Sequence, residues 1–477
     1  MNPSFSAPSR GLISAIFTLA WPTIIEQLLQ TVVQYADSAM VGQLGAAASA
    51  AVGITTSPMW LVSSFFLAAG IGVLAVTARA IGARERDRAG RTAVQSIFLT
   101  LFLGLVVGGL ALLVSGSLPG WMGAEEQVQP VASAYFFIVS LPMVFRGAMM
   151  IFGAVLRATG DTRTPMLVNL LMNFINVILN FLLIYETRRV SLFGCSFSMW
   201  GAGMGVIGAG IATAIALTVG GTLMTLFLFL SKRGGSPMGY PFRLEKTILK
   251  DCVQVALPNA GERLVVCLGQ MMFASLIAGL GTVPLAAHSI ATTAEEAFYI
   301  PGVGFQAAGT TLAGQTLGEG DERKLDRLVP WVLLFGVGIM SLISTMLFFF
   351  PETLMGFFTQ DHAVIESGAQ VLRIISLSEP FFALLLVLEG IFHGVGDTKA
   401  PFVISFATMW GVRILFTALC VKGLSLGLTA AWCCMGADLV VRACLMFYRY
   451  RSGRWKKKLF FPSNCNKPAD SLKGAAL

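Results

Sequence analysis

Residues 21–45, WPTIIEQLLQTVVQYADSAMVGQLG, form an apolar segment that can cross a membrane as a helix and yet contains two acids. A charged side chain at the bilayer centre costs about 2.5–3.5 kcal/mol on insertion scales, so such residues must face a partner or a polar path. Helical geometry gathers four polar side chains within about 80° on one face: Glu26, Gln30, Gln34 and Asp37. This polar stripe predicts transport, and a buried structural pair held by neighbouring helices is the alternative.

The composition places the whole chain in a membrane. Of its 477 residues, 55% are hydrophobic and 12% are charged, whereas a soluble domain has about 25% charged residues. Apolar runs of about 20 residues or more recur, and each can cross roughly 30 Å of hydrocarbon. They predict an all-α membrane protein with twelve transmembrane helices, at residues 12–41, 47–78, 92–116, 130–156, 164–185, 205–231, 250–279, 283–316, 328–350, 364–392, 400–421 and 425–448.

The distribution of lysine and arginine predicts the orientation. Twelve spans leave both termini on one side, and the loops on that side hold most of the basic residues. The opposite loops hold only Arg188, Arg189 and Lys422. The positive-inside rule therefore predicts a multi-pass protein of the cell inner membrane with both termini in the cytoplasm. These topology determinants also explain the net charge of +8, so no nucleic-acid partner is expected.

The chain contains an internal repeat at a constant offset of 236 residues. Glu26 recurs as Glu262, and LRATGDTRTP at 156–165 recurs as FHGVGDTKAP at 392–401. One register held over such a distance indicates a duplication. Because six spans are an even number, the two six-helix bundles keep the same orientation, related by a pseudo-twofold axis along the membrane normal.

The repeat divides the chain into four parts. We expect an N-terminal six-helix lobe at 1–231, a cytoplasmic linker at 232–249, a C-terminal six-helix lobe at 250–448 and a basic cytoplasmic tail at 449–477. The loop at 185–203 and the tail are expected to be disordered or peripheral.

The paired GDT motifs lie on the predicted cytoplasmic side. Glycine permits a tight turn, aspartate can cap the next helix, and proline is tolerated in its first turn. The motifs are interpreted either as a gate or hinge that moves as the lobes rock, or as simple capped turns. Their candidate residues are Gly160, Asp161, Pro165, Gly396, Asp397 and Pro401.

The two halves differ in their polar residues. Asp37 is matched by Phe273, and a ladder of asparagines in the fifth span has no asparagine mates. Carboxylate and amide oxygens suit a proton or a small cation, so the coupling-ion site, with a possible Na⁺ near Asp37, is predicted in the first half. The ladder falls within about 60° of one helix face and consists of Asn169, Asn173, Asn176 and Asn180.

The second half contributes a candidate path for substrate or protons, formed by Glu262, Gln270, His288 and Glu295. For His288, packing between helices is the alternative. The sequence assigns no role to Glu379, Glu389 or Arg146, for which paired structural charges and function are equal explanations. It contains no Walker loop, and its three histidines are far apart, so we expect neither a cofactor nor an enzyme.

These motifs together resemble the multidrug and toxic compound extrusion (MATE) family, in its DinF- and NorM-like bacterial branch. The resemblance covers nearly the whole chain and extends to ALPNAGERLVVCLGQ and AAHSIATTAEEAFYIPG, which are similar to the family's seventh and eighth helices. It implies two bundles arranged as a V and antiport of H⁺ or Na⁺ against cationic or amphipathic compounds. It places Asp37, Asn176 and Thr213 in the N-lobe cation constellation. Asn180 departs from the aspartate usual in the DinF-like branch, which leaves the coupling ion open.

Two other functions compete with antiport. A lipid-linked oligosaccharide flippase of the same superfamily would favour a cationic lumen, whereas the stripes here are acidic and amide-bearing, which suits cations. A membrane-embedded transferase should show clustered loop acids or a histidine-rich metal set. The expected partners are small cationic or amphipathic substrates, H⁺ or Na⁺ and the bilayer, and we expect a monomer.

Overall fold

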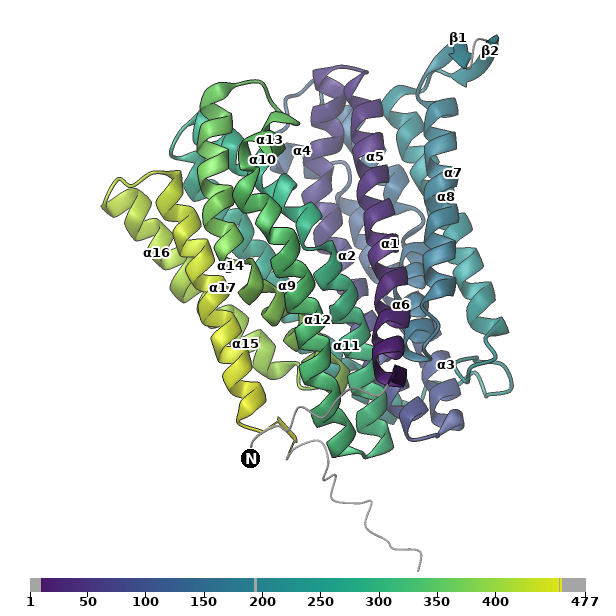
Figure 1. The fold of residues 1–477 in the computed structure, drawn as a ribbon. Coiled ribbons are helices and arrows are strands. Elements are labelled where there is room, and N and C mark those ends of the chain that lie inside the picture. The colour runs from purple at the N-terminus through teal and green to yellow at the C-terminus, as the bar shows by residue number, and fades with distance from the viewer. Residues whose placement is uncertain (1–9, 193–194, 454, 457–477) are drawn as a thin grey trace, which may run out of the picture.

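The computed structural model describes residues 10–192, 195–453 and 455–456. The described chain is almost entirely helical, with most of the first half (purple to teal) beside the second half (green to yellow) in Figure 1. The first half comprises α1 (Arg10–Gly42), α2 (Ala46–Gly82), α3 (Arg86–Val114), α4 (Leu118–Trp121), α5 (Gln129–Ser140), α6 (Met143–Ala158), α7 (Arg163–Leu183) and α8 (Gly205–Leu230).

The second half begins after the loop at 231–245. It comprises α9 (Lys246–Ala278), α10 (Thr282–Phe298), α11 (Ile300–Glu319), α12 (Glu322–Phe349), α13 (Pro351–Gly356), α14 (His362–Val395), α15 (Lys399–Thr408), η1 (Met409–Ile414), α16 (Leu415–Ala418), η2 (Leu419–Gly423) and α17 (Leu428–Arg451). The segments η1 and η2 are π-helical turns, which widen the helix locally.

The helices agree with the predicted spans, with two exceptions. Within the described residues, ten helical spans are long and apolar enough to cross a membrane, or eleven with the bent pair α5 and α6 counted as one. The predicted single helix at 130–156 is this pair, bent by 49°. The predicted helix at 283–316 is likewise divided, into α10 and α11. Their repeat mates, α14 and α2, are continuous.

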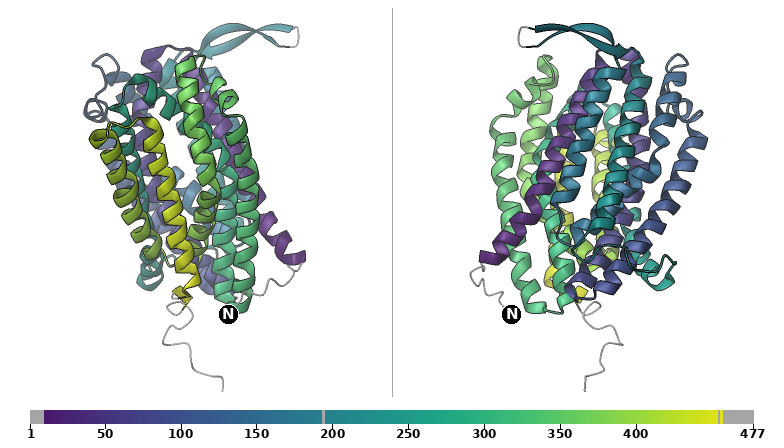
Figure 2. Two further views of the ribbon diagram at one scale, coloured as in Figure 1. Left: turned by 60° about the vertical axis from the view of Figure 1, so that its left-hand side comes forward. Right: turned by 90° about the vertical axis from the view of Figure 1, so that its right-hand side faces the viewer.

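The two ends of the bundle differ. At one end lie the start of α1 and the arginine-rich turn between α2 and α3, and we call this the basic end. From the other end, the hairpin end, a two-stranded sheet projects beyond the helices (Figures 1 and 2). Its antiparallel strands are β1 (Glu186–Leu192) and β2 (Cys195–Ala202). Of the two expectations for 185–203, disordered or peripheral, the described part agrees with the second, because backbone pairing forms a hairpin that projects beyond the helices.

The halves pack together through glycines near the basic end. A Cβ on Gly82 of α2 would meet the backbone of Gln315 in α11, and a Cβ on Gly318 of α11 would meet the backbone of Arg79 in α2. Gly82 and Gly318 are repeat mates, as are Arg79 and Gln315. This reciprocal contact is what a twofold axis between α2 and α11 requires.

The hydrophobic cores interlock across the same region. Ile16 and Ala20 of α1 belong to the core of the second half, whereas Ile248 and Cys252 of α9 belong to the core of the first half. The first helix of each half therefore packs partly with the other half. We call the contact of α2 with α9 and α11 the seam.

Candidate functional site

The asparagine ladder and Asp37 come together where α1, α7 and α8 meet. Asn180 donates from Nδ2 to Asp37 Oδ1 at 2.6 Å and to Asn176 Oδ1 at 3.2 Å. Asn176 donates to the Thr213 hydroxyl at 3.3 Å. Asn173 is also buried on α7. The structure thus gathers Asp37, Asn176, Asn180 and Thr213 into one cluster, which we call the aspartate site.

The Asn176 amide has two possible orientations in the aspartate site, which differ in whether its oxygen or its nitrogen faces Asp37. In the orientation above, its oxygen lies 3.1 Å from both Asp37 carboxylate oxygens. Turned over, its nitrogen donates to both of them and its oxygen accepts from Thr213 at 3.3 Å. The first arrangement needs a proton or a cation between the oxygens, whereas the second satisfies an ionised carboxylate. The second arrangement gives both the oxygen and the nitrogen of Asn176 a partner and places a donor against the Asp37 carboxylate.

Glu26 lies apart from the aspartate site, nearer the basic end of α1. Its Oε1 accepts from Asn169 Nδ2 at 2.7 Å, and its Oε2 lies 3.8 Å from Arg157 Nη1. Asn169 is therefore a partner of Glu26 and not of Asp37. Gln30 and Gln34, between the two acids, are exposed. The predicted stripe is thus divided into two sites, one at Glu26 and one at Asp37, and two exposed glutamines lie between them on α1.

Glu262 in the second half has matching partners. Its Oε1 accepts from Ser405 Oγ at 2.7 Å, and its Oε2 lies 3.6 Å from His393 Nε2. The His393 ring also lies 2.9 Å from the amide nitrogen of Asn259. Ser405 and His393 are the repeat mates of Asn169 and Arg157. Each half therefore holds a three-residue cluster on the same register, which we call the glutamate clusters.

Sequence reasoning missed Arg157 and His393. The residue types differ, so matching identical letters does not pair them. The available signal was the repeat itself: the 236-residue offset pairs Arg157 with His393 at the start of the two GDT stretches, and both are basic residues. Glu26 and Glu262 are thus confirmed as positional mates, while their function stays a prediction.

The other polar residues of the second half are dispersed. His288 contacts the rings of Phe273 and Trp432, with centroids 5.5 and 5.7 Å away, which favours the packing interpretation. Gln270 is exposed, and Glu295 lies within electrostatic range of Arg413. The structure does not join these three residues with Glu262 into one site.

A buried ion cluster occupies the wall formed by η1 and α17. Asp438 accepts from Arg442 Nη2 at 2.9 Å and forms an ion pair with Arg413, whose Nε lies 2.9 Å away, and Arg442 Nε also donates to Thr408. Three residues without an assigned role are elsewhere. Arg146 donates to Ser63 at 3.3 Å, Glu389 accepts from Gln306 at 3.4 Å, and Glu379 is 1% exposed.

The GDT motifs form the predicted tight turns. Gly160 and Gly396 have φ of +83° and +82°, in the region that favours glycine. Asp161 accepts from the Thr164 backbone N–H at 3.2 Å, as a cap does, whereas Asp397 pairs with Arg449 at 2.8 Å. Pro165 and Pro401 are buried in the first turns of α7 and α15. The turn geometry is confirmed, and a gating role remains a prediction.

Three comparisons match this fold. Residues 22–182 and 258–419 match the MatE family model. The chain is 30% identical to the probable multidrug resistance protein NorM of Thermotoga maritima over 93% of both chains. It is 26% identical to the uncharacterized transporter YisQ of Bacillus subtilis, over 93% of this chain and 95% of that one. A solved outward-facing MATE family transporter of the MOP superfamily aligns with a TM-score of 0.84 at 23% identity, over 95% of this chain and all of that one.

The fold and its relatives define a multi-pass membrane transporter and not an enzyme. The chain belongs to the MATE family. The predicted family and the predicted twelve-helix fold class are confirmed.

Proposed function

We propose that this transporter is a secondary antiporter that exports cationic or amphipathic small molecules in exchange for H⁺ or Na⁺. Several relatives carry the name multidrug resistance protein, which supports this substrate class. The membrane-embedded polar residues of the first half are acids and amides, which suit cations. The proposal places both termini in the cytoplasm, with lobes at 1–231 and 250–448 joined by a linker at 232–249 and followed by the tail at 449–477.

The aspartate site is the proposed coupling-ion site, and one observation carries this assignment. Among the described residues, neither Glu379 nor Glu389 has a lysine or arginine within ion-pair distance, and nor does Asp37, but the structure gathers the neutral side chains of Asn176, Asn180 and Thr213 at Asp37. The charge of Asp37 in an apolar wall must therefore be balanced by a proton or a bound cation. Asn176, Asn180 and Thr213 add only neutral ligands, so one monovalent ion is expected per cycle. A proton is favoured, because a Na⁺ cage usually has more anionic oxygen.

Exchange requires that the site open alternately to the two sides. We assign this motion to rocking of the lobes about the seam, which is packed in this structure. Arg79 donates across it to the Val395 carbonyl at 3.0 Å, next to the second GDT turn. This contact supports the second GDT turn, at Gly396, as part of the proposed gate, and the repeat assigns the same role to Gly160. Ion and substrate can drive the motion only through their different affinities for the two states.

The direct test is dye efflux from proteoliposomes under pH and Na⁺ gradients imposed separately. We expect the pH gradient alone to drive efflux, because the site has one carboxylate. Efflux driven only by a Na⁺ gradient would identify Na⁺ as the coupling ion and would still support antiport. Transport that responds to neither gradient would contradict the proposal.

A further inference from the structure

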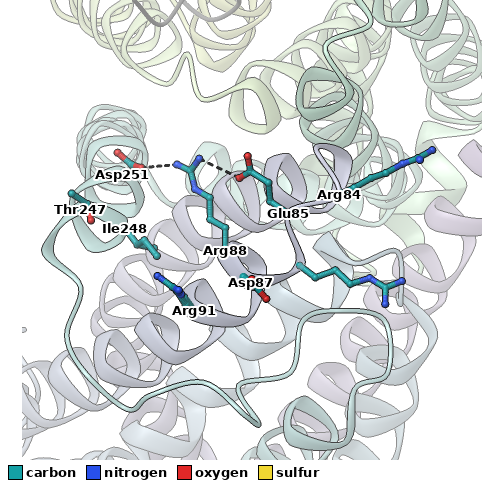
Figure 3. A pocket seen from close by; sticks show the side chains of 9 residues that line it. Arg84, Glu85, Asp87, Arg88, Arg91, Thr247, Ile248 and Asp251 are labelled. Atoms are coloured by element: carbon teal, nitrogen blue, oxygen red, sulfur yellow. Dashed lines mark hydrogen bonds and ion pairs between the residues drawn. The ribbon is translucent and has the colours of Figure 1, made fainter. Parts of the chain in front are cut away.

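The basic end holds a pocket that the transport proposal does not use. A cavity of about 670 Å³ lies between the α2–α3 turn and the first turns of α9 (Figure 3). Arg88 spans it, 3.0 Å from Asp251 of α9 and 3.6 Å from Glu85 of the turn. A second pocket of about 410 Å³ is lined by Arg84, Arg86 and Arg233.

Three arginines in these pockets lack a counter-charge among the described residues, and one of them, Arg233, donates to the Gly160 carbonyl at 2.9 Å. Arg84 and Arg86 line both pockets and are exposed. Arg88 is engaged by two acids, and Arg91 lies 3.8 Å from Glu245. In the part of the chain that the structure describes, no carboxylate lies within ion-pair distance of Arg84 or Arg86. The two side chains thus offer free guanidinium groups to an anion.

The backbone at Arg84 indicates that its side chain matters. Arg84 has φ +60°, in the left-handed region that disfavours side chains, and its repeat mate Gly320 has φ +72°. The second half therefore uses glycine at this turn, whereas the first half keeps an arginine despite the strain. Topology alone does not explain this choice, because any loop position can carry the positive charge.

The matching surface of the second half is already neutralised by the chain. Arg86 is matched by Glu322, which accepts from Lys456 at 3.0 Å. Asp326 accepts from the same ammonium group at 2.5 Å. Glu322 and Asp326 thus share an internal cation, whereas Arg84 and Arg86 have no internal anion within ion-pair distance among the described residues.

The position of the pocket favours an anion from the membrane. The linker beside it exposes Met238, Phe242 and Leu244, with 59%, 57% and 52% of their surface accessible. The linker is tied to the turn by Tyr240, which donates to Asp87 at 3.2 Å and packs against Gly90. Exposed apolar side chains beside a basic cluster at the end of membrane helices are suited to the lipid headgroup layer.

We propose that Arg84 and Arg86 bind the phosphate headgroup of an anionic phospholipid from the surrounding membrane. Guanidinium groups bind phosphate through paired hydrogen bonds. The Arg84 side chain points away from Ile248 and Asp251 of α9 (Figure 3), and the second pocket, where Arg84 and Arg86 meet Arg233, is lined by residues of the first half and of the linker. Binding therefore does not depend on the proposed antiport.

The test measures the melting temperature of the full-length protein in a neutral detergent. Phosphatidylglycerol, phosphatidylcholine and soluble glycerol phosphate are added separately to wild type and to Arg84→Ala/Arg86→Ala. We expect phosphatidylglycerol alone to raise the melting temperature of wild type by several degrees, and we expect the double variant to lose this shift. An equal shift from soluble glycerol phosphate would overturn the lipid assignment in favour of a free anion.

Two further variants separate binding from folding. Arg323→Ala/Arg327→Ala removes two exposed arginines from the matching region and should keep the full lipid shift. Arg84→Gly relieves the backbone strain, so its melting temperature without lipid should equal or exceed that of wild type while the lipid shift falls. An undiminished lipid shift in Arg84→Gly and in the Arg84→Ala/Arg86→Ala variant would refute the proposal.

Discussion

Asp37 is the residue whose chemistry bears most directly on the proposed coupling. Asp37→Asn keeps the shape of the side chain and its neighbours Asn176 and Asn180 but removes the group that exchanges a proton or a cation. We expect gradient-driven efflux to be abolished and substrate binding to be retained. Proteoliposome efflux and equilibrium dye binding measure the two separately. Proton-driven efflux that survives in Asp37→Asn would exclude this residue as the coupling site.

Asn180 is a neutral partner of Asp37, because its amide nitrogen donates to the Asp37 carboxylate at 2.6 Å. Changing Asn180 to an acid would therefore change the charge of the aspartate site. Asn180→Asp adds a second carboxylate, and two such groups in contact cannot both stay ionised without a cation. We expect the ion preference to move toward Na⁺, measured as efflux under a Na⁺ gradient alone. Asn173→Asp, about two turns away on α7, is the matched control and should change the preference less.

The glutamate clusters make a further comparison at this scale. Glu26→Gln leaves the permanently charged Arg157 without its carboxylate, whereas Glu262→Gln leaves His393, which can be neutral. We therefore expect both variants to reduce efflux but Glu26→Gln to lower the melting temperature more. Glu26→Gln/Arg157→Gln should recover part of that loss. Normal transport in both single variants would show that the acids are structural, and equal melting temperatures would contradict the expected difference between Arg157 and His393.

At the scale of elements, apolar run length predicted where helices lie but not where they break. The breaks fall at Pro142, which precedes α6, and at Pro301, in the first turn of α11. Proline removes a backbone donor and can end a helix. Yet Pro22 and Pro258 lie inside the continuous helices α1 and α9. Neighbouring helices can compensate the lost hydrogen bond, so the outcome depends on packing that the sequence does not display.

The candidate sites were predictable to a similar extent. Helical spacing and the repeat offset identified Asp37, the asparagine ladder and the paired glutamates. The partition of the ladder was not predictable, because Asn169 lies on the same helix face as Asn176 and yet bonds to Glu26. The hairpin was missed because its pairing depends on backbone geometry and not on an apolar run.

The π-helical turn η1 lies beside the buried ion cluster and contributes Arg413 to it. Asp438→Asn would leave two buried guanidinium groups without a counter-charge, which costs about 3–5 kcal/mol when one partner of a buried ion pair is removed. We expect a large fall in melting temperature and in the yield of folded protein. Glu352→Gln breaks the exposed pair with Arg373 and should cost about 0–1 kcal/mol. A similar small loss in both variants would contradict this account.

At the scale of the whole molecule, the proposed rocking makes the packing of the seam the determinant of which state the transporter occupies. The reciprocal contacts of Gly82 and Gly318 hold α2 against α11, and Gly72 lets α2 approach α9. Small residues allow such close backbone contact between membrane helices. Because packed interfaces tend to be bistable, an obstruction at one of these glycines should favour the alternative state over a graded opening.

Gly72 offers the sharpest test of this idea. A Cβ there would meet the Cys252 carbonyl and lie 2.9 Å from Ala256 Cβ, so Gly72→Ala prevents the seam from packing as it does here. Cys252 is 1% exposed in the packed seam. We expect Gly72→Ala to raise the labelling rate of Cys252 by thiol reagents, followed peptide by peptide with mass spectrometry, and to slow efflux. Gly53→Ala is the matched control on the same helix, because its Cβ would have no atom within 4 Å. If thiol reagents labelled Cys252 as slowly in Gly72→Ala as in Gly53→Ala, the seam would accommodate the added methyl group by a local shift and would stay packed. Rocking would then need a hinge elsewhere than the contact of α2 with α9.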